Sequence, residues 1–389
     1  MARPRVYLDW NASSPLLPAA RAALIEALEI VGNPSSIHQE GRAARALVEE
    51  ARAQVAALVG ARPDRVIFTS GGTEAMNLAL TPGFLPADRR PADVLILSAG
   101  EHACALEGHR FAQERVRIAP LDGEGRLDLA ALEALLAELG DLRPMLALQA
   151  ANNETGVLQP VAEACGLVRE RGGIVVCDAV QAAGRIACGF DALPADALAL
   201  SGHKIGAPKG SGALVLRDPA ANIESMQIRG GGQERGARAG TENAAGLAAF
   251  GAAAKTVRQH GLDDIPRQRG LRDGLEATLK AALPDLVIFG QGAPRLSNTS
   301  AFALSGAAAA TLLIALDLEG FALSSGSACS SGKVKPSHVL AAMGVAPELA
   351  QGAIRVSIGR DTGAPELEAF ADVFATAAAR IARRGQDAA

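Results

Sequence analysis

The sequence is poor in aromatic side chains and has no long uninterrupted apolar run. Aromatic residues make up 3% of the 389 residues and hydrophobic residues 49%, so the core must consist mainly of Ala, Leu, Val and Ile. No apolar run approaches the roughly 20 residues that cross a bilayer. Residues 1–13 also lack the apolar segment of a secretion signal. These absences favour a cytoplasmic protein, and the length favours two unequal domains.

An excess of positive charge is also missing. The formal net charge is -4, and residues of both signs are scattered along the chain. A nucleic-acid-binding protein needs a basic face for the phosphates, so this class is disfavoured. Small anionic ligands remain possible, because a few local donors are enough to bind them.

The five cysteines contain no CxxC pair, and an odd number does not suit a closed disulfide framework. Four of them stand in apolar contexts and are predicted to be small buried residues: Cys104, Cys165, Cys177 and Cys188. Cys329 differs, because it lies in the Gly/Ser-rich stretch 324–332. A thiol in such a loop could approach a bound substrate and carry a product away, although an incidental exposed cysteine is the plain alternative.

Short apolar runs alternate with helical segments over the first 250 residues. Near-continuous apolar strands of this kind predict a mostly parallel sheet covered by helices on both faces, an α/β fold. The predicted strands are 66–69, 94–98, 145–149, 174–177, 197–200 and 213–216. Segments such as 41–59 and 127–139 are predicted to be helices.

The pattern changes after about residue 250. A helical stretch over 244–283, interrupted near Pro266, leads into strand-like runs at 286–289, 299–304 and 356–358. We therefore predict a large domain over residues 16–250, and a smaller α+β domain formed by residues 1–15 and 251–389. The Gly-rich stretch 229–236 is too polar for a regular element and is predicted to be a functional loop.

Two predicted strands are followed by residues that suit a pyridoxal cofactor. Lys204 comes after strand 197–200, where burial would lower its pKa and make it a candidate Schiff-base former. Asp178 follows strand 174–177 and could pair with a protonated ring nitrogen. Taken alone, a solvated lysine and a helix-capping aspartate are the commoner interpretations.

Other strand ends add complementary groups. Gly72 and Thr73 lie in a turn before a helix, where free N–H groups could hold a phosphate, although the P-loop spacing is absent. His102 could stack on a flat ring and transfer protons. Gln181 could donate to a ring oxygen, and the guanidinium fork of Arg355 suits a substrate carboxylate. Each has an ordinary explanation alone, but together they favour one site.

Three motifs carry a resemblance to a known family: Ser201-Gly202-His203-Lys204, Gly230-Gly231-Gly232-Gln233-Glu234-Arg235-Gly236 and Ser324-Ser325-Gly326-Ser327-Ala328-Cys329. The chain resembles the cysteine desulfurases of the NifS/IscS type, within the class V aminotransferase-like, fold-type I pyridoxal-phosphate enzymes. The resemblance covers nearly the whole chain. Departures from the family pattern are modest, such as Ser13-Ser14 in place of two threonines and Ala103 after His102.

The resemblance implies a role for each residue. Lys204 would bind pyridoxal 5'-phosphate covalently and remove the substrate's α-proton, with His102 stacked on the ring and Asp178 paired with its nitrogen. Gln181 and Asn153 would contact the ring's oxygen side, and the phosphate would be bound by Gly72, Thr73, Ser201 and His203. Thr241 would reach the phosphate of a neighbouring subunit, which implies a homodimer. The carboxylate of L-cysteine would be held by Asn33, Asn153 and Arg355.

By the same resemblance, Cys329 would take the sulfur as a persulfide and leave L-alanine. The sulfur would pass to an acceptor, commonly an iron–sulfur scaffold protein, whose cluster Cys329 could ligate transiently. Lys333 and Lys335 are hypothesised partner contacts. Two alternatives stay open, namely another class V reaction such as that of a selenocysteine lyase or an aminotransferase, and a non-catalytic subunit of the same fold. The sequence does not distinguish nitrogenase, general iron–sulfur and tRNA-thiolation pathways.

Overall fold

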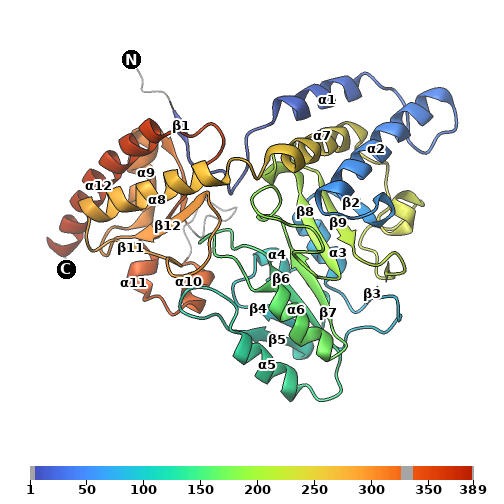
Figure 1. The fold of residues 1–389 in the computed structure, drawn as a ribbon, viewed down its shortest axis with the longest axis horizontal. Helices are drawn as coiled ribbons and strands as arrows, with labels where there is room; N and C mark the ends of the chain where they lie inside the picture. Colours follow the sequence, from blue (N-terminus) through green and yellow to red (C-terminus); the bar gives the residue numbers. More distant parts are fainter. Residues whose placement is uncertain (1–4, 326–335, 388–389) are drawn as a thin grey trace.

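The computed structural model describes residues 5–325 and 336–387. Figure 1 shows a larger body built on one sheet and a smaller body that contains both ends of the described chain. Among the described residues, no helix is both long and apolar enough to cross a membrane.

The larger body is built on a seven-stranded sheet of order β2-β9-β8-β7-β6-β4-β5. β9 runs antiparallel to both of its neighbours, and the other strand pairs are parallel. The strands are β2 (Val66–Thr69), β4 (Val94–Ser98), β5 (Val116–Ala119), β6 (Pro144–Gln149), β7 (Ile174–Asp178), β8 (Ala197–Ser201) and β9 (Gly212–Leu216). The predicted mostly parallel α/β sheet is confirmed.

Both faces of this sheet are buried, which explains the near-continuous apolar strands. In β4, Val94 and Ile96 join the core on one face, whereas Leu95 and Leu97 join the core on the other. The helices α2 (Gln39–Leu58), α5 (Leu129–Glu138), α6 (Val161–Glu170) and α7 (Ala244–His260) contribute to the first core. The second core includes α3 (Gly72–Ala79) and α4 (Ala103–Leu106). α1 (Pro18–Leu28) packs beside α7.

The smaller body contains a four-stranded antiparallel sheet of order β11-β12-β15-β14. Its strands are β11 (Val287–Ile288), β12 (Thr299–Ala303), β14 (Ser324–Ser325) and β15 (Ile354–Ser357). The helices around it are α8 (Ile265–Ala282), α9 (Ala309–Leu318), α10 (His338–Ala342), α11 (Pro347–Ala350) and α12 (Ala364–Asp387). Phe302 and Phe374 pack edge to face in its core, with ring centroids 5.1 Å apart.

The long helical stretch breaks where it was predicted to break. α7 ends at His260, and α8 begins at Ile265 with Pro266 in its first turn, a position that tolerates the missing N–H of proline. The domain boundary near residue 250 stays a prediction, and α7 continues through that position against the larger core.

The N-terminal segment connects the two bodies. β1 (Val6–Tyr7) pairs with β13 (Phe321–Ala322), and Asp9 forms a bridge with Ser357 of the small sheet. A few residues later the backbone N–H of Ser14 donates to the carbonyl of His203, next to the end of β8. Residues 9–14 therefore cross from the small sheet to the strand ends of the large one (Figure 1).

The Gly-rich stretch 229–236 contains a buried ion pair. Glu234, with a φ of 48° in the left-handed region, turns its carboxylate into the protein. There it accepts two hydrogen bonds from Arg52, at 2.7 and 2.9 Å, and one from the N–H of Phe68 at 2.9 Å. Both charged side chains are at most 5% exposed. This part of the predicted functional loop thus anchors α2 to β2.

We expect Glu234→Ala to lower the free energy of unfolding by about 3–5 kcal/mol, because it leaves Arg52 buried without its counter-ion. The matched control is Glu224→Ala, which removes an exposed ion pair with Arg89 and should cost less than about 1 kcal/mol. Urea denaturation of the three proteins measures the difference. Equal effects of the two substitutions would contradict a stabilising role for the Glu234 pair.

Candidate active site

A cavity of about 780 Å³ lies between the strand ends of the large sheet and the small sheet. It is lined by polar residues from both bodies, although they are distant in the sequence. Ten of the predicted site residues line it: Gly72, Thr73, His102, Asn153, Asp178, Gln181, Ser201, His203, Lys204 and Arg355. The cavity thus gathers the ends of separate strands, as expected for a ligand site in an α/β sheet.

Lys204 directs its amine at the N-terminal segment. It follows β8 in the short turn Gly202–Lys204, and Nζ donates to the carbonyls of Asn11 and Ala12 at 2.5 and 3.0 Å. Burial, with added repulsion from Arg185 and Arg355, lowers the pKa of Lys204 to about 8. The amine therefore loses its proton around pH 8, well below an ordinary lysine, which makes the neutral form needed by a nucleophile or base more accessible.

Asp178 is a buried carboxylate at the end of β7. Its Oδ1 accepts a hydrogen bond from the N–H of Val180 at 2.9 Å, and none of the ion pairs between described residues includes it. Burial raises the pKa of Asp178, while His102 and Lys204 oppose that rise. A protonated ring nitrogen would supply the missing counter-charge, so this side chain fits the predicted cofactor.

His102 caps the N-terminus of α4, and its Nδ1 accepts from the N–H of Cys104 at 3.1 Å. In the neutral ring Nε2 then carries the proton. The ring is exposed on the cavity wall, yet the protein around it lowers its pKa by desolvation, which Asp178 partly opposes. The result is a flat, neutral ring beside the cavity, suited to stacking on a cofactor.

The part of the cavity lined by the start of α3 suits a phosphate. Gly72 and Thr73 begin α3, where backbone N–H groups are free of helical partners. A Cβ on Gly72 would lie 2.7 Å from Val180, so the chain can approach this closely only with glycine. Ser201, which lies close to Gly72, and His203 also line the cavity and could add donors. Burial lowers the pKa of His203 to about 4, so the ring is neutral.

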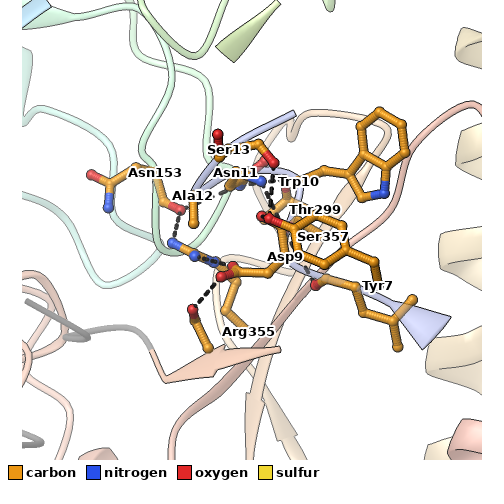
Figure 2. A network of polar contacts seen from close by, with 12 residues as sticks. Tyr7, Asp9, Trp10, Asn11, Ala12, Ser13, Asn153, Thr299, Arg355 and Ser357 are labelled. Carbon is orange, nitrogen blue, oxygen red and sulfur yellow. Dashed lines mark hydrogen bonds and ion pairs between the residues drawn. The ribbon is translucent and has the colours of Figure 1, made fainter. Parts of the chain in front are cut away.

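Arg355 lies on β15 and is held by two groups (Figure 2). Its Nη2 pairs with Oδ1 of Asp9 at 2.6 Å, and Nη1 donates to the carbonyl of Asn153 at 2.9 Å. Nε is buried and has no hydrogen-bond partner among the described residues. The guanidinium is therefore buried at the cavity wall and is not part of a solvent-exposed ion pair.

Several predicted residues lie elsewhere. Asn33 and Thr241 are exposed and do not line the cavity of this chain, so their substrate and neighbouring-subunit roles stay predictions. Cys329, Lys333 and Lys335 lie outside the described residues. In the part of the chain that the structure describes, no cluster of three or more His, Cys, Asp or Glu could hold a metal ion.

The four other cysteines are buried, as predicted. Burial raises the pKa of the Cys188 thiol to about 11 and that of Cys165 to about 12. The pKa values of Cys104 and Cys177 are raised as well, for the same reason. None of these four thiols is set up to be a thiolate at neutral pH.

The sequence interpretation missed polar residues that complete the cavity. Asn11 and Glu154 line it, and so does His338, whose Nε2 bonds the carbonyl of Glu101 at 2.9 Å. Glu154 accepts a hydrogen bond from Ser337 at 2.5 Å. The Glu101 carboxyl is fully buried, and burial raises its pKa well above the usual range. The sequence offered one signal for Glu101, because it is a charged residue that stands between two apolar runs.

Comparison with known proteins gives a consistent result. The family model described as aminotransferase class V matches residues 6–370. A cysteine desulfurase of Cereibacter sphaeroides is 41% identical over 376 residues, covering 95% of both chains. An IscS-like cysteine desulfurase of Mycobacterium tuberculosis is 36% identical, with 98% of both chains covered. The crystal structure of a NifS-like protein from Rickettsia africae superposes with a TM-score of 0.86 at 33% identity, covering 96% of this chain and 99% of the other.

The environment of Lys204 predicts a measurable titration. In the cofactor-free protein the amine should titrate near pH 8, and Asp178→Asn should lower this pKa further, because the Asp178 charge opposes the effect of burial. NMR of protein labelled at the lysine ε-carbon measures the titration, with Lys204→Arg to assign the signal. An unchanged or higher pKa in Asp178→Asn would contradict the electrostatic account.

Proposed function

The chain belongs to the class V aminotransferase family and is a pyridoxal-phosphate-dependent cysteine desulfurase, and from that premise we propose which residues carry the reaction. The observation that supports the assignment best is the convergence of Lys204 and Asp178 in one cavity. One is a buried lysine with a lowered pKa, and the other is a buried carboxylate without an ion-pair partner among the described residues.

The proposed cofactor site uses groups on three sides. Lys204 would hold pyridoxal phosphate covalently, Asp178 would pair with its ring nitrogen and His102 would cover the ring. Gln181 and Asn153 would lie on the oxygen side; the Gln181 amide already donates to the carbonyl of Asn11 at 3.0 Å and keeps a second N–H. The phosphate would be bound by Gly72, Thr73, Ser201 and His203. When bound, the cofactor supplies an electron-withdrawing ring conjugated to the substrate's α-carbon.

The chain's own residues then bind the substrate and move its protons. Arg355 would hold the α-carboxylate of L-cysteine, with help from Asn153 and Asn33. Lys204 in its neutral form would accept the α-proton at Nζ, which its lowered pKa permits. The neutral ring of His102 would keep the reacting groups aligned and assist proton transfer.

Cys329 is the proposed sulfur acceptor. Its thiolate would attack the sulfur of the substrate, so that an S–S bond forms while the bond between substrate Cβ and sulfur breaks. The electron pair of that bond passes to carbon, which takes up a proton. The balance is L-cysteine plus the Cys329 thiol giving L-alanine plus a Cys329 persulfide, with no external oxidant. The burial of the four other thiols supports this assignment.

The persulfide sulfur would pass to an acceptor protein. An iron–sulfur scaffold is the acceptor class we propose, with transient ligation of its cluster by Cys329 and with Lys333 and Lys335 as partner contacts. We also propose a homodimer in which Thr241 serves the phosphate site of the neighbouring copy. Its exposure outside this chain's cavity supports that role.

A product assay tests the Cys329 assignment. Wild-type holoenzyme given L-cysteine and a reductant should release alanine and sulfide in equal amounts, and Cys329→Ser should release neither while still binding the cofactor. The matched control is Cys188→Ala, a buried cysteine outside the cavity, which should retain wild-type turnover. A fully active Cys329→Ser enzyme would contradict the persulfide mechanism.

Subunit mixing tests the shared site. Lys204→Ala and Thr241→Ala proteins should each be impaired, but a mixed dimer contains one site with both residues intact. Random reassembly should therefore restore about one quarter of the wild-type sites, as two-fold symmetry requires. If Thr241 acts within its own chain, mixing restores nothing.

A further inference from the structure

Asp9 contacts the proposed substrate-binding arginine without lining the cavity. Its side chain is 17% exposed, and that of Arg355 is 7% exposed. Arg355 and Ser324, which both line the cavity, are each bonded to Asp9. Asp9 therefore lies behind the cavity wall, where it can act on a ligand only through its neighbours.

The backbone fixes Asp9 in place on both sides. The N–H of Trp10 donates to the carbonyl of Ser357 at 3.2 Å, and the N–H of Ser357 donates to the carbonyl of Leu8 at 2.9 Å. The hydroxyl of Tyr7 donates to the carbonyl of Asp9 itself at 3.1 Å. These backbone bonds fix the position of the Asp9 carboxylate relative to the neighbouring strand β15 (Figure 2).

Both carboxylate oxygens of Asp9 are used. Oδ1 accepts from Nη2 of Arg355 at 2.6 Å, and Oδ2 accepts from the hydroxyl of Ser324 at 2.8 Å. The carbonyl of Asn153 holds Nη1 of the same guanidinium at 2.9 Å. Because a guanidinium is a rigid plane, two contacts on different nitrogens fix its orientation.

The guanidinium of Arg355 still has N–H donors that neither Asp9 nor Asn153 uses. Asp9 and the carbonyl of Asn153 each engage one terminal nitrogen of Arg355, so Nη1 and Nη2 each keep a second N–H, and Arg355 lines the cavity. Glu154 is a second carboxylate within electrostatic reach of Arg355: burial raises the pKa of Glu154, and the charge of Arg355 is among the influences that oppose this rise. Without Asp9, Arg355 would be free to turn towards that competing acceptor.

We propose that Asp9 is a positioning residue for substrate binding: it fixes the plane of Arg355 so that the remaining N–H donors meet the α-carboxylate of the amino acid. The inference rests on the proposed role of Arg355. It assigns no direct contact between Asp9 and the substrate, because Asp9 lies outside the cavity lining.

The experiment compares holoenzymes carrying Asp9→Ala, Asp9→Asn, Arg355→Gln and the double substitution Asp9→Ala/Arg355→Gln with the wild type. Two quantities are measured: the steady-state constants for L-cysteine, and the calorimetric Kd values of L-alanine and L-alaninamide. L-Alaninamide keeps the amine and the methyl group but has no carboxylate, so it reports on everything except the carboxylate contact.

We expect Asp9→Ala to raise KM for L-cysteine and Kd for L-alanine by about tenfold, the size of one charge-assisted contact. kcat should change by less than about threefold, because the contact acts on binding, and the Kd of L-alaninamide should not change. Asp9→Asn keeps an acceptor for Nη2 and should recover most of the affinity. In the Arg355→Gln background, Asp9→Ala should have no further effect on L-alanine binding.

Three results would overturn the proposal: unchanged L-alanine affinity in Asp9→Ala, equal losses for L-alanine and L-alaninamide, or additive effects in the double variant. If Asp9→Ala is not recovered folded, Asp9→Ser, too short to reach Arg355, takes its place in the same comparison. Unchanged L-alanine binding in Arg355→Gln would remove both this inference and the carboxylate role of Arg355. A wild type that binds L-alanine but makes none from L-cysteine would instead defeat the proposed reaction and leave the binding comparison to decide on Asp9.

Discussion

Asn11 is hydrogen-bonded from both sides of the cavity, and the geometry of the site depends on these bonds. Its amide donates to the hydroxyl of Thr299 at 2.9 Å and accepts from Asn298 at 3.1 Å, both in the smaller body. Its carbonyl accepts from Gln181 and from Lys204, which come from the strand ends of the large sheet. One buried residue of the N-terminal segment therefore links the two bodies beside the cavity, in addition to the direct bonds of Arg355 to Asn153 and of His338 to Glu101. A polar network of this kind rigidifies the protein when all of its members are satisfied.

The charges around the cavity are balanced across the two bodies. Arg185 and Arg355 lower the pKa of Lys204, whereas Asp178 and Asp9 act in the opposite direction. Burial is the largest cause of the lowered pKa of Lys204. The packing of the two bodies around the cavity therefore affects the reactivity of this lysine as well as the structure. Arg355 and Asp9 reach the lysine from the small sheet and the N-terminal segment, so the reactivity of a large-sheet residue depends on the other body.

The strand ends were the predictable part of the site. Lys204, Asp178 and His102 each follow an apolar run, and parallel strands bring their carboxyl ends to one edge of the sheet. The ion pair of Asp9 with Arg355 was not predictable, because 346 positions separate the two residues. No local pattern indicates that β15 and the residues after β1 run side by side. His338 was missed for the same reason, since its partner Glu101 lies 237 positions away.

The sequence by itself determined the large α/β sheet, the break before Pro266, the burial of four cysteines and the family resemblance. All of these follow from local patterns, because apolar runs, glycine turns and a proline act over a few residues. The tertiary structure decided which partners the charged groups have: Glu234 of the Gly-rich stretch pairs with Arg52 in the core, and Arg355 pairs with Asp9 at the cavity wall. The physical reason is that a buried charge is stabilised by whichever opposite charge the fold brings within a few ångströms, and that choice depends on packing rather than on distance along the chain.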